Sequence, residues 1–236
     1  MLTCGAACSG GAANGGAWGF ARVLRLEHAA LATQSADVSR DATTTASCRA
    51  LLEASPTEAE VVWMGDTRLV ARLRTCASTQ GRGKAVVKGT YAITGGLGGL
   101  GLRAAALLIE SSASQLHLLS RSGRMVRGGR GLEACTGSIG HVRSVVCDVG
   151  DAGETEMLVA CATFVGVLHA AGVLYDKMLR SMATTDVHAV FVPKALAAFH
   201  VQAIVVRTPL EVLALFSSVA SIFGNFGQAN YAAANA

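Results

Sequence analysis

The chain of 236 residues is 51% hydrophobic and 15% charged, and it contains three prolines. This length and composition are typical of a soluble α/β protein with one large or two small domains, and they exclude a disordered or fibrous chain. The net charge of +4 is modest, and no stripe of basic residues interleaved with aromatics is present, so nucleic acid is not an expected partner. The N-terminus has no basic segment followed by an apolar core, and no uninterrupted apolar run reaches membrane-spanning length. Neither export nor membrane insertion is therefore expected.

Seven cysteines are scattered along the chain, an odd number without a C-x-x-C pair. This pattern indicates reduced thiols rather than disulfides or a metal site. The sequence therefore predicts a cytoplasmic protein that holds no metal.

The first 85 residues predict a small subdomain that precedes the main fold. Residues 1–17 are rich in Gly, Ala and Cys and show no periodicity, so they are expected to form a loop or the incomplete edge of a domain. Residues 18–31 predict an amphipathic helix, and residues 50–54 predict one further helical segment. The apolar stripe expected on the first helix consists of Phe20, Val23, Leu24 and Leu31.

Two strand-like runs follow, at residues 60–64 and 68–73. The intervening Gly65-Asp66-Thr67 is typical of a hairpin turn. Residues 75–88 are rich in Ser, Thr, Gly and basic residues and are expected to form a linker. We therefore place a domain boundary near residue 85, with a partial subdomain at 1–85 and the main domain at 86–236.

A glycine-rich turn lies between a short apolar run at residues 91–93 and a run of strong helix formers at residues 102–110. A strand, a glycine turn and a helix, in this order, are the context in which G-x-G-x-x-G and T-G-x-x-x-G-x-G predict a dinucleotide site. Glycine lets the backbone turn tightly and lets a pyrophosphate approach, and the free N–H groups of the helix N-terminus face that anion. A flexible linker would explain the glycines but not the strand and helix beside them. The residues expected to bind the cofactor here are Thr94, Gly95, Gly96, Leu97, Gly98, Gly99, Leu100 and Gly101.

A second buried strand is expected at residues 115–120, and it ends at Ser120 and Arg121. An NAD-specific site usually has Asp or Glu at this strand end, where the ribose hydroxyls bind. This chain instead has Arg121, which suits the 2′-phosphate of NADPH. Arg127 and Arg130, further along the chain, are expected to lie in a solvated loop. The sequence therefore favours NADPH as the cofactor.

The remaining elements alternate between strand and helix. Strands are expected at residues 141–149, 164–172 and 210–216, and helices at residues 153–163, 175–184, 186–205 and 228–236. This alternation predicts an α/β fold with a Rossmann-type, doubly wound parallel sheet and right-handed crossovers. Ligands of such sheets bind beyond the carboxyl ends of the strands. The further residues expected at those ends are Asp148, Val149, His169, Ala170, Ala171, Gly172, Ser217 and Ser218.

Two of these residues have a predicted contribution of their own. Asp148 is placed where a side chain accepts a hydrogen bond from the adenine amino group. His169 is open to two interpretations, a general base or a packing and capping residue, and a histidine at a strand end is more often the second. The small residues from Ala170 to Gly172 leave room for a planar ring or a ribose.

Ser218 follows the last buried strand, and Tyr231 begins a helix thirteen residues later. Together with T-G-x-x-x-G-x-G, this spacing resembles the short-chain dehydrogenase/reductase (SDR) family. Most of that family has lysine four residues after the tyrosine, where this chain has Asn235. The chain in this respect resembles the ketoreductase domains of modular polyketide synthases and related fatty acid synthases, in which the lysine and the asparagine exchange positions. Their lysine lies in a Pro-Lys pair on the preceding helix, which Pro193-Lys194 matches here.

The resemblance covers nearly the whole chain. Residues 18–28 are similar to the family's W-G-x-x-R-x-x-R-L-E-H segment, and residues 60–73 are similar to the hairpin that closes its structural subdomain, a truncated Rossmann-like half without cofactor. Residues 169–174 and 216–220 also match family motifs. Family sheets continue with two more strands beyond the tyrosine helix. We therefore expect a C-terminally truncated catalytic subdomain and a fragment of a larger synthase or an incomplete gene product.

The resemblance implies a role for each residue of the catalytic set. Tyr231 would deliver the proton to the substrate oxygen, and Ser218 would hydrogen-bond the carbonyl and polarise it. Lys194 would supply the cation that stabilises the phenolate, and it would also hold the nicotinamide ribose. Asn235 would orient the tyrosine or the lysine through a water or a backbone link. Lys177 is a rival cation, but its position matches no family motif.

The reaction implied by the resemblance is NADPH-dependent reduction of a β-ketoacyl thioester on acyl carrier protein, giving the β-hydroxyacyl thioester, in polyketide or fatty acid biosynthesis. Leu174-Tyr175-Asp176 keeps the second aspartate of an L-D-D triplet, and Phe223 stands where another type has tryptophan, which favours the D-configured hydroxyl. Tyr175 and Phe226 depart from the L-D-D type. Two alternatives stay open. One is a non-catalytic remnant or structural module that binds nucleotide weakly or not at all, and the other is a free-standing carbonyl reductase, against which the N-terminal subdomain argues.

Overall fold

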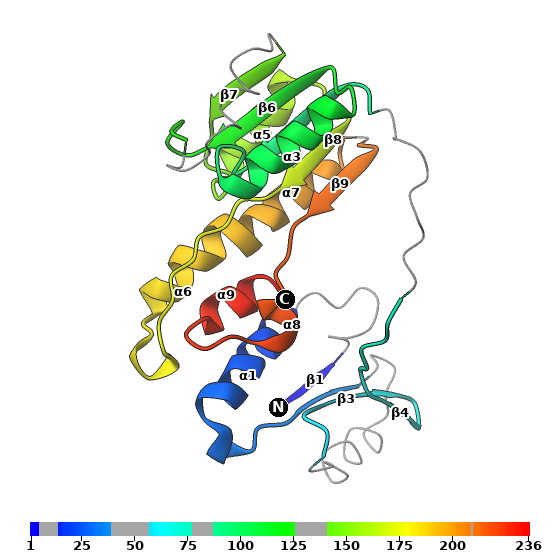
Figure 1. Ribbon diagram of the computed structural model, residues 1–236, viewed down its shortest axis with the longest axis vertical. Helices are drawn as coiled ribbons and strands as arrows, with labels where there is room; N and C mark the ends of the chain where they lie inside the picture. Colours follow the sequence, from blue (N-terminus) through cyan, green and yellow to red (C-terminus); the bar gives the residue numbers. More distant parts are fainter. Residues whose placement is uncertain (5–13, 39–56, 77–86, 126–140, 209) are drawn as a thin grey trace. The chain divides into compact units, whose positions relative to one another are not determined.

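The computed structural model describes residues 1–4, 14–38, 57–76, 87–125, 141–208 and 210–236. The chain forms two compact units, each with its own sheet (Figure 1). The first unit contains Met1–Ser78, Leu174–Val187 and Ser217–Ala236, and the second unit contains Thr79–Val173 and His188–Phe216. The domain boundary predicted near residue 85, the helical segment predicted at residues 50–54, and Arg127 and Arg130 lie outside the described residues.

The second unit contains a five-stranded parallel sheet in the order β7-β6-β5-β8-β9. Its strands are β5 (Thr90–Thr94), β6 (Gln115–Ser120), β7 (Val142–Val146), β8 (Gly166–His169) and β9 (Val212–Leu215). The chain starts in the middle of the sheet at β5, moves outward to β7, and then returns to the other side at β8. The strand order therefore reverses between β5 and β8, which is where such sheets bind their ligands. The predicted doubly wound Rossmann sheet is confirmed.

Helices cover both faces of this sheet (Figure 1). Successive side chains of a strand point to opposite faces, so Tyr91 and Ile93 pack with residues of α3 (Gly99–Glu110). Ala92, between them, packs on the opposite face with residues of α7 (Ala197–Val205) and α5 (Ala152–Cys161). Because both faces of the central strands β5, β6 and β8 are buried, these strands appear in the sequence as short apolar runs rather than as an alternating pattern.

Helix α7 is the last part of a long helix that begins with α6 (Thr184–Phe191) and passes through a π-helical turn, η4 (Val192–Leu196). Pro193 lies in this turn, and since proline has no N–H to donate, it disfavours regular α-helical bonding there. By length and composition the helix Thr184–Val205 is able to cross a membrane, and 28% of its most apolar window is buried. A single helix of this kind is weak support for a membrane span, because the core helix of a soluble protein passes the same test.

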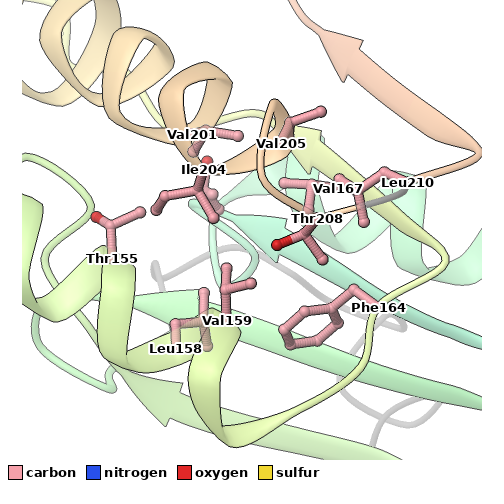
Figure 2. Close-up of a pocket in the computed structure, with 11 residues that line it drawn as sticks. Thr155, Leu158, Val159, Phe164, Val167, Val201, Ile204, Val205, Thr208 and Leu210 are labelled. Atoms are coloured by element: carbon pink, nitrogen blue, oxygen red, sulfur yellow. The ribbon is translucent and has the colours of Figure 1, made fainter.

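A small cavity remains between α5, α7 and the sheet (Figure 2). Its volume is about 20 Å³, and its apolar wall includes Leu158, Val159, Phe164 and Val205. A space of this size holds about one methyl group, and an apolar wall offers a water molecule no partner. The cavity is therefore best described as a small packing void of the second unit.

The first unit contains a four-stranded sheet in the order β1-β2-β3-β4. Its first three strands, β1 (Leu2–Cys4), β2 (Ser35–Val38) and β3 (Glu60–Met64), are parallel, and β4 (Thr67–Leu69) pairs antiparallel with β3. The predicted hairpin is therefore confirmed, with Gly65 at a φ of 59° in its turn, but its second strand ends at Leu69 and not at residue 73. The parallel strands form the Rossmann-like half that the sequence predicts.

The loop predicted at residues 1–17 is wrong at both ends, because β1 begins at Leu2 and helix α1 (Gly15–Glu27) begins at Gly15. Strand β1 has only three residues, and it is held by pairing with β2, whose partner residues lie more than thirty positions further along the chain. A pairing over that distance leaves no local periodicity. Strand β2 is missing from the sequence prediction for the same reason.

Helix α1 packs against α9 (Ala229–Ala234) within the first unit. A Cβ on Gly19 would lie 2.4 Å from the Ala232 carbonyl oxygen, so the two backbones approach too closely for a side chain. The buried residues of α1 are Trp18, Gly19, Ala21 and Val23. Two members of the predicted stripe, Phe20 and Leu31, are instead 40% and 64% exposed. The stripe prediction is right for Val23 and wrong for Phe20 and Leu31, because the small Gly19 lets α1 approach α9 closely.

The helix predicted at residues 175–184 is also wrong. Apart from a single 3₁₀ turn, η3 (Leu179–Ser181), this segment is irregular, and distant groups bind its backbone. The Leu179 N–H donates to the Glu27 carboxylate at 2.7 Å, and the Lys177 N–H donates to the Gly227 carbonyl at 2.7 Å. Helix α8 (Ala220–Phe223) and the 3₁₀ turn η2 (Ala29–Leu31) are short elements that the sequence did not predict.

Candidate active site

The turn after β5 requires glycine for packing at several positions. Gly95 has a φ of 64°, and a Cβ on it would lie 2.7 Å from the Ala171 Cα, beyond the end of β8. A Cβ on Gly101 would lie 2.4 Å from the Gly95 carbonyl oxygen. The Gly96 N–H donates to the Leu119 carbonyl of β6 at 2.9 Å. These contacts hold β5, β6, β8 and the start of α3 together at one edge of the sheet.

Gly99 is different, because a Cβ there would meet no atom of the described residues within 4 Å. It is the first residue of α3, and no side chain caps this helix at Gly98. Hydrogen bonding to the turn resumes at Leu102, whose N–H donates to the Gly98 carbonyl at 2.9 Å. The open space beside Gly99 and the uncapped helix N-terminus fit the pyrophosphate of a dinucleotide.

Arg121 lies directly beyond the last residue of β6, Ser120, and its side chain is exposed. Strand β6 is paired with β5, so Arg121 follows the strand next to the glycine turn. Among the residues that the structure describes, the Arg121 guanidinium has no ion-pair partner. Its N–H donors are thus available for an anionic group of a ligand.

Asp148 and Val149 lie beyond β7 in a tight turn. The Asp148 N–H donates to the Glu154 carboxylate at 2.7 Å, and the Asp148 Oδ1 accepts from the Gly150 N–H at 2.9 Å. Val149 is buried and packs with the core residues on the α5 and α7 face of the sheet. One carboxylate oxygen of Asp148 therefore holds the turn, and the other is available as an acceptor.

His169 ends β8, and its ring is 1% exposed. Its Nε2 lies 3.0 Å from the Lys194 carbonyl, and its Nδ1 lies 2.7 Å from Thr94 Oγ1. A carbonyl only accepts, so Nε2 carries the proton and Nδ1 accepts from the threonine hydroxyl. Thr94 Oγ1 in turn accepts from the Ala171 N–H at 3.3 Å. Burial, together with the nearby Lys194 charge, lowers the pKa of His169 to about 4, so the ring is neutral at physiological pH. Because both nitrogens are engaged within the protein, the ring packs and caps, as the second interpretation has it.

Lys194 lies in the π-helical turn η4 and is 7% exposed. Its ammonium donates to the Phe216 carbonyl, just beyond the end of β9. Burial lowers the pKa of Lys194. Inside the second unit, the His169 ring therefore connects Thr94, at the start of the glycine turn, to the backbone of η4, which carries Lys194.

Ser218 lies in a turn that precedes α8 in the first unit. Its Oγ accepts from the Ala220 N–H at 3.2 Å, so the hydroxyl proton is free to be donated elsewhere. The neighbouring Ser217 hydroxyl donates to the Asn235 carbonyl at 2.6 Å. This bond ties the turn with Ser218 to the end of helix α9.

Tyr231 and Asn235 belong to the same end of the first unit. The Asn235 Nδ2 donates to the Tyr231 carbonyl at 2.9 Å, whereas its Oδ1 is buried without a partner among the described residues. The Tyr231 N–H donates to the side chain of Asn230, which is 1% exposed and in turn donates to the Tyr175 carbonyl. The backbone N–H and the backbone carbonyl of Tyr231 are therefore both held by side chains, those of Asn230 and Asn235.

The structure groups the predicted site residues in two sets. The glycine turn, Ser120, Arg121, Asp148, Val149, residues 169–172 and Lys194 all belong to the second unit, and Ser218, Tyr231 and Asn235 belong to the first. The rival cation Lys177 pairs with Asp186 at 2.7 Å, which raises its pKa. Its charge is thus already used in the first unit.

Sequence reasoning missed three residues that hold these sets in place: Thr94 as a hydroxyl donor to His169, Asn230, and Ser221, whose hydroxyl donates to the Ser218 carbonyl at 2.6 Å. Each makes its hydrogen bond either to a residue that is distant in the sequence or to a backbone group. Neither kind of contact leaves a motif in the sequence. Among the described residues, no group of three or more His, Cys, Asp or Glu side chains is arranged to hold a metal ion. Burial raises the pKa of the Cys147 thiol to about 11, which makes it an unreactive core residue.

The doubly wound sheet and the glycine turn are the features expected of a protein of the SDR type. The family model of the KR domain matches residues 89–236. Polyketide synthase GfsA of Streptomyces halstedii is 41% identical over 155 residues, which cover 63% of this chain and 2% of that protein. A phenolphthiocerol/phthiocerol polyketide synthase of Mycobacterium tuberculosis is 33% identical over 237 aligned positions, which cover 92% of this chain and 12% of that protein.

Solved structures agree with these relatives. A structure described as A-type ketoreductases from a modular polyketide synthase superposes with a TM-score of 0.84 at 32% identity, covering 99% of this chain and 53% of that one. The ketoreductase from the first module of phoslactomycin biosynthesis in Streptomyces sp. HK803 gives a TM-score of 0.85 at 31% identity, covering 99% and 57%. The chain thus spans about half the length of these ketoreductases and a small part of the synthases.

This chain belongs to the KR, or ketoreductase, domain family of modular polyketide synthases. KR domains are SDR-type oxidoreductases that bind a nicotinamide cofactor, and the family reaction is ketoreduction in polyketide biosynthesis. The relatives are components of modular synthases, which contain further domains. The family resemblance and the fold predicted from the sequence are both confirmed.

Proposed function

We propose that this chain reduces a β-ketoacyl thioester, carried on acyl carrier protein, to the β-hydroxyacyl thioester, with NADPH as the reductant. The observation that carries the catalytic part is the hydrogen bond from Ser217 to the Asn235 carbonyl, which ties the turn bearing Ser218 to the helix bearing Tyr231. A proton donor and a carbonyl-binding hydroxyl must share one substrate oxygen, and this bond fixes the spacing of their backbones.

Ser218 and Tyr231 divide the work at the substrate oxygen. The Ser218 hydroxyl already accepts from the Ala220 N–H, so its own proton points to another acceptor, and a substrate carbonyl suits it. Tyr231 then donates its phenolic proton to the same oxygen as negative charge develops there. Polarisation and protonation together make the carbonyl carbon a better acceptor.

Lys194 is the proposed cation beside the phenol. Its ammonium binds the Phe216 carbonyl. Ser218 follows Phe216 by two residues, so the Cα atoms of Phe216 and Ser218 lie within about 7 Å of each other. Lowering of the Lys194 pKa by burial means that its charge is poorly solvated and gains from an anionic partner. The Oδ1 of Asn235 is buried without a partner among the described residues, so it is free to accept a hydrogen bond from a water molecule.

The residues of the second unit fit NADPH. The open backbone at Gly99 and the N-terminus of α3 suit the pyrophosphate, Arg121 suits the 2′-phosphate, and the free oxygen of Asp148 suits the adenine amino group. When bound, the nicotinamide supplies the reducing equivalent to the carbonyl carbon. The partners we expect are the acyl carrier protein and the other domains of an intracellular, cytoplasmic synthase.

The test is a spectrophotometric assay of the purified chain with NADPH and a β-ketoacyl N-acetylcysteamine thioester. We expect loss of nicotinamide absorbance in the wild type and in Tyr175→Phe, and at least a hundredfold slower loss in Tyr231→Phe. Tyr175 is the matched control because its side chain is 48% exposed and the substitution leaves its carbonyl, which accepts from Asn230, unchanged. NADPH binding without turnover in the wild type would overturn the proposal in favour of a non-catalytic module.

The hydroxyl configuration is read from the product of the same assay. Asp176, the residue that favours the D configuration, accepts from Gln228 through both carboxylate oxygens at 3.1 Å. Gln228 immediately precedes α9, so Asp176 is connected to the tyrosine helix. Chiral chromatography that shows mainly the L product would refute this assignment.

A further inference from the structure

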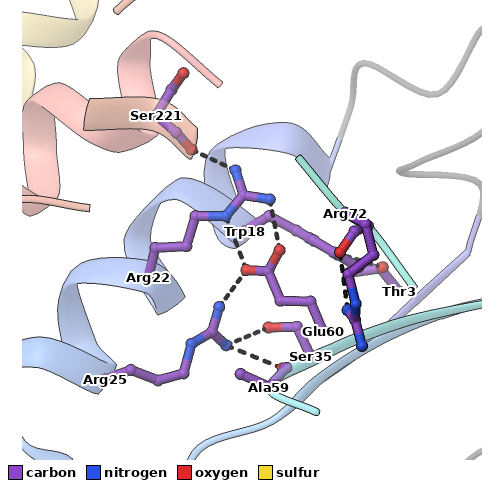
Figure 3. Close-up of polar contacts among 10 residues, drawn as sticks. Thr3, Trp18, Arg22, Arg25, Ser35, Ala59, Glu60, Arg72 and Ser221 are labelled. Carbon is purple, nitrogen blue, oxygen red and sulfur yellow. Dashed lines mark hydrogen bonds and ion pairs between the residues drawn. The ribbon is translucent and has the colours of Figure 1, made fainter. Parts of the chain in front are cut away.

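Arg22 on α1 connects the sheet of the first unit to Ser221 of α8 (Figure 3). Its Nε and Nη2 donate to the two carboxylate oxygens of Glu60 on β3, at 2.8 and 2.7 Å. Its remaining nitrogen, Nη1, donates to the Ser221 carbonyl. The guanidinium also lies 5.8 Å from the centre of the Trp18 ring. A planar group held by a bidentate pair, a carbonyl and a ring has few other orientations, so it forms a rigid link.

Ser221 is the second residue of α8, and it binds the turn that carries Ser218. Both the hydroxyl and the N–H of Ser221 donate to the Ser218 carbonyl, at 2.6 and 3.0 Å. The Ser221 Oγ also lies 3.3 Å from the hydroxyl of Ser217, which binds the Asn235 carbonyl. A displacement of Ser221 would therefore move Ser218 and would loosen the bond to the tyrosine helix.

The charges of this cluster favour the same arrangement. Arg22 and Arg25 share the single carboxylate of Glu60, so the cluster has a net positive charge. Their side chains are 20% and 17% exposed, and that of Glu60 is 21% exposed, so the three charged groups are only partly exposed to water. Both oxygens of the Glu60 carboxylate already accept hydrogen bonds from the two arginines. The Nη1 of Arg22 therefore donates to a backbone carbonyl instead.

We propose that Arg22, oriented by Glu60, is a positioning residue for the reaction: it holds the Ser218 turn in the geometry in which the serine hydroxyl meets the substrate carbonyl. This inference rests on the proposed function. It gives the sheet of the first unit a part in catalysis, through β3 and α1, in addition to its part in folding.

Arg25 provides a matched control. It lies one turn further along α1 and binds the same Glu60 carboxylate. Its other bonds go to the Ser35 hydroxyl at 3.0 Å and the Ala59 carbonyl at 3.4 Å, so it contacts the sheet and not the serine turn. Loss of Arg25 therefore removes the ion pair and the packing without removing the contact with Ser221.

The experiment compares Arg22→Met, Arg22→Lys and Arg25→Met in the full chain, by kcat, KM, the NADPH dissociation constant and the unfolding temperature. We expect kcat to fall about tenfold or more in both Arg22 variants and to stay within about twofold in Arg25→Met, because displacement of a catalytic group by a fraction of an ångström has effects of this size. Lysine does not rescue, since it lacks the fork that reaches Glu60 and Ser221 together. NADPH affinity should stay unchanged in all three. Equal losses of kcat in Arg22→Met and Arg25→Met would overturn the inference and leave Arg22 a purely structural residue.

Amide hydrogen exchange separates this inference from the proposed function. In Arg22→Met we expect the amides of residues 218–224 to exchange about tenfold faster than in Arg25→Met, whether or not the chain turns over substrate. If the wild type has no reductase activity, the proposed function fails, and the exchange data alone decide whether Arg22 holds the serine turn. Equal exchange in the two variants would overturn the inference even in an active enzyme.

Discussion

The ring of His169 donates through Nε2 to the backbone carbonyl of Lys194, 3.0 Å away. This bond joins the end of β8 to the π-helical turn that bears the lysine, and it needs a neutral ring whose other nitrogen accepts from Thr94. A protonated ring donates through both nitrogens. The Thr94 hydroxyl would then have to accept a hydrogen bond from Nδ1 and could no longer donate one to it. The position of Lys194 is therefore linked to the protonation state of His169.

The first prediction concerns stability against pH. The folded pKa of His169, about 4, lies below the ordinary value of 6.5, so between these values the unfolded chain binds a proton that the folded chain does not. The free energy of unfolding therefore falls as the pH is lowered through this window, by about 1.6 kcal/mol between pH 6.5 and pH 5 from this one group.

We expect His169→Gln to remove this contribution, so that its free energy of unfolding changes less between pH 7 and pH 5 than that of the wild type. Urea titrations at the two pH values measure the difference. His188→Gln is the control, because His188 is exposed and should keep the wild-type pH dependence. A wild-type pH dependence in His169→Gln would show that the ring is not held neutral.

The second prediction separates a structural glycine from a binding glycine. Gly101→Ala places a Cβ 2.4 Å from the Gly95 carbonyl oxygen, so we expect a loss of about 1–3 kcal/mol in the free energy of unfolding. Gly99→Ala meets no atom of the described residues within 4 Å, so stability should be retained while NADPH binding weakens about tenfold or more. Thermal unfolding and fluorescence titration with NADPH measure the two effects. Unchanged NADPH affinity in Gly99→Ala would contradict the placement of the pyrophosphate.

The third prediction concerns cofactor choice. Hydrogen bonds to a charged group contribute about 1.5–3 kcal/mol, so Arg121→Ala should raise the dissociation constant of NADPH roughly ten- to hundredfold. The dissociation constant of NADH, which lacks the 2′-phosphate, should change little. Arg207→Ala is the control, since Arg207 is exposed at the end of α7. Parallel weakening of NADPH and NADH would mean that Arg121 does not recognise the phosphate.

The fourth prediction concerns the small cavity of the second unit. Val205→Ile adds one methylene to the wall of a void of about 20 Å³, so we expect a gain of up to about 0.8 kcal/mol in the free energy of unfolding. Val206, the next residue, is 83% exposed, and Val206→Ile should have no effect. Urea unfolding of both variants is the measurement. Destabilisation by Val205→Ile would show that the wall cannot adjust to the added group.

The glycine turn shows how much of the cofactor site a sequence contains. The strand at residues 90–94, the turn and the helix that follows are contiguous, so local propensity and spacing were sufficient to predict them. The same holds for the strand at residues 115–120, whose bounds the structure reproduces. The family was recognisable because Ser218, Tyr231, Asn235 and Lys194 keep a fixed spacing along the chain.

Contacts between distant residues were out of reach of such reasoning. The sequence placed Phe20 in the buried stripe of α1, but the close approach of Gly19 to Ala232 turns another face inward. It also missed the short strand at Leu2–Cys4, which exists only through its pairing with Ser35–Val38.

By itself, the sequence determined the order of the strands in the second unit, the α/β class and the family, and it proposed the candidate site residues, because propensity and motif spacing are properties of neighbouring positions. Only the tertiary structure decided which nitrogen of His169 bears the proton, that Lys177 is paired with Asp186, and that Arg22 reaches the carbonyl of Ser221. Each of these is a hydrogen bond or ion pair whose partner is set by packing. Packing brings together residues whose separation along the chain carries no signal of their contact.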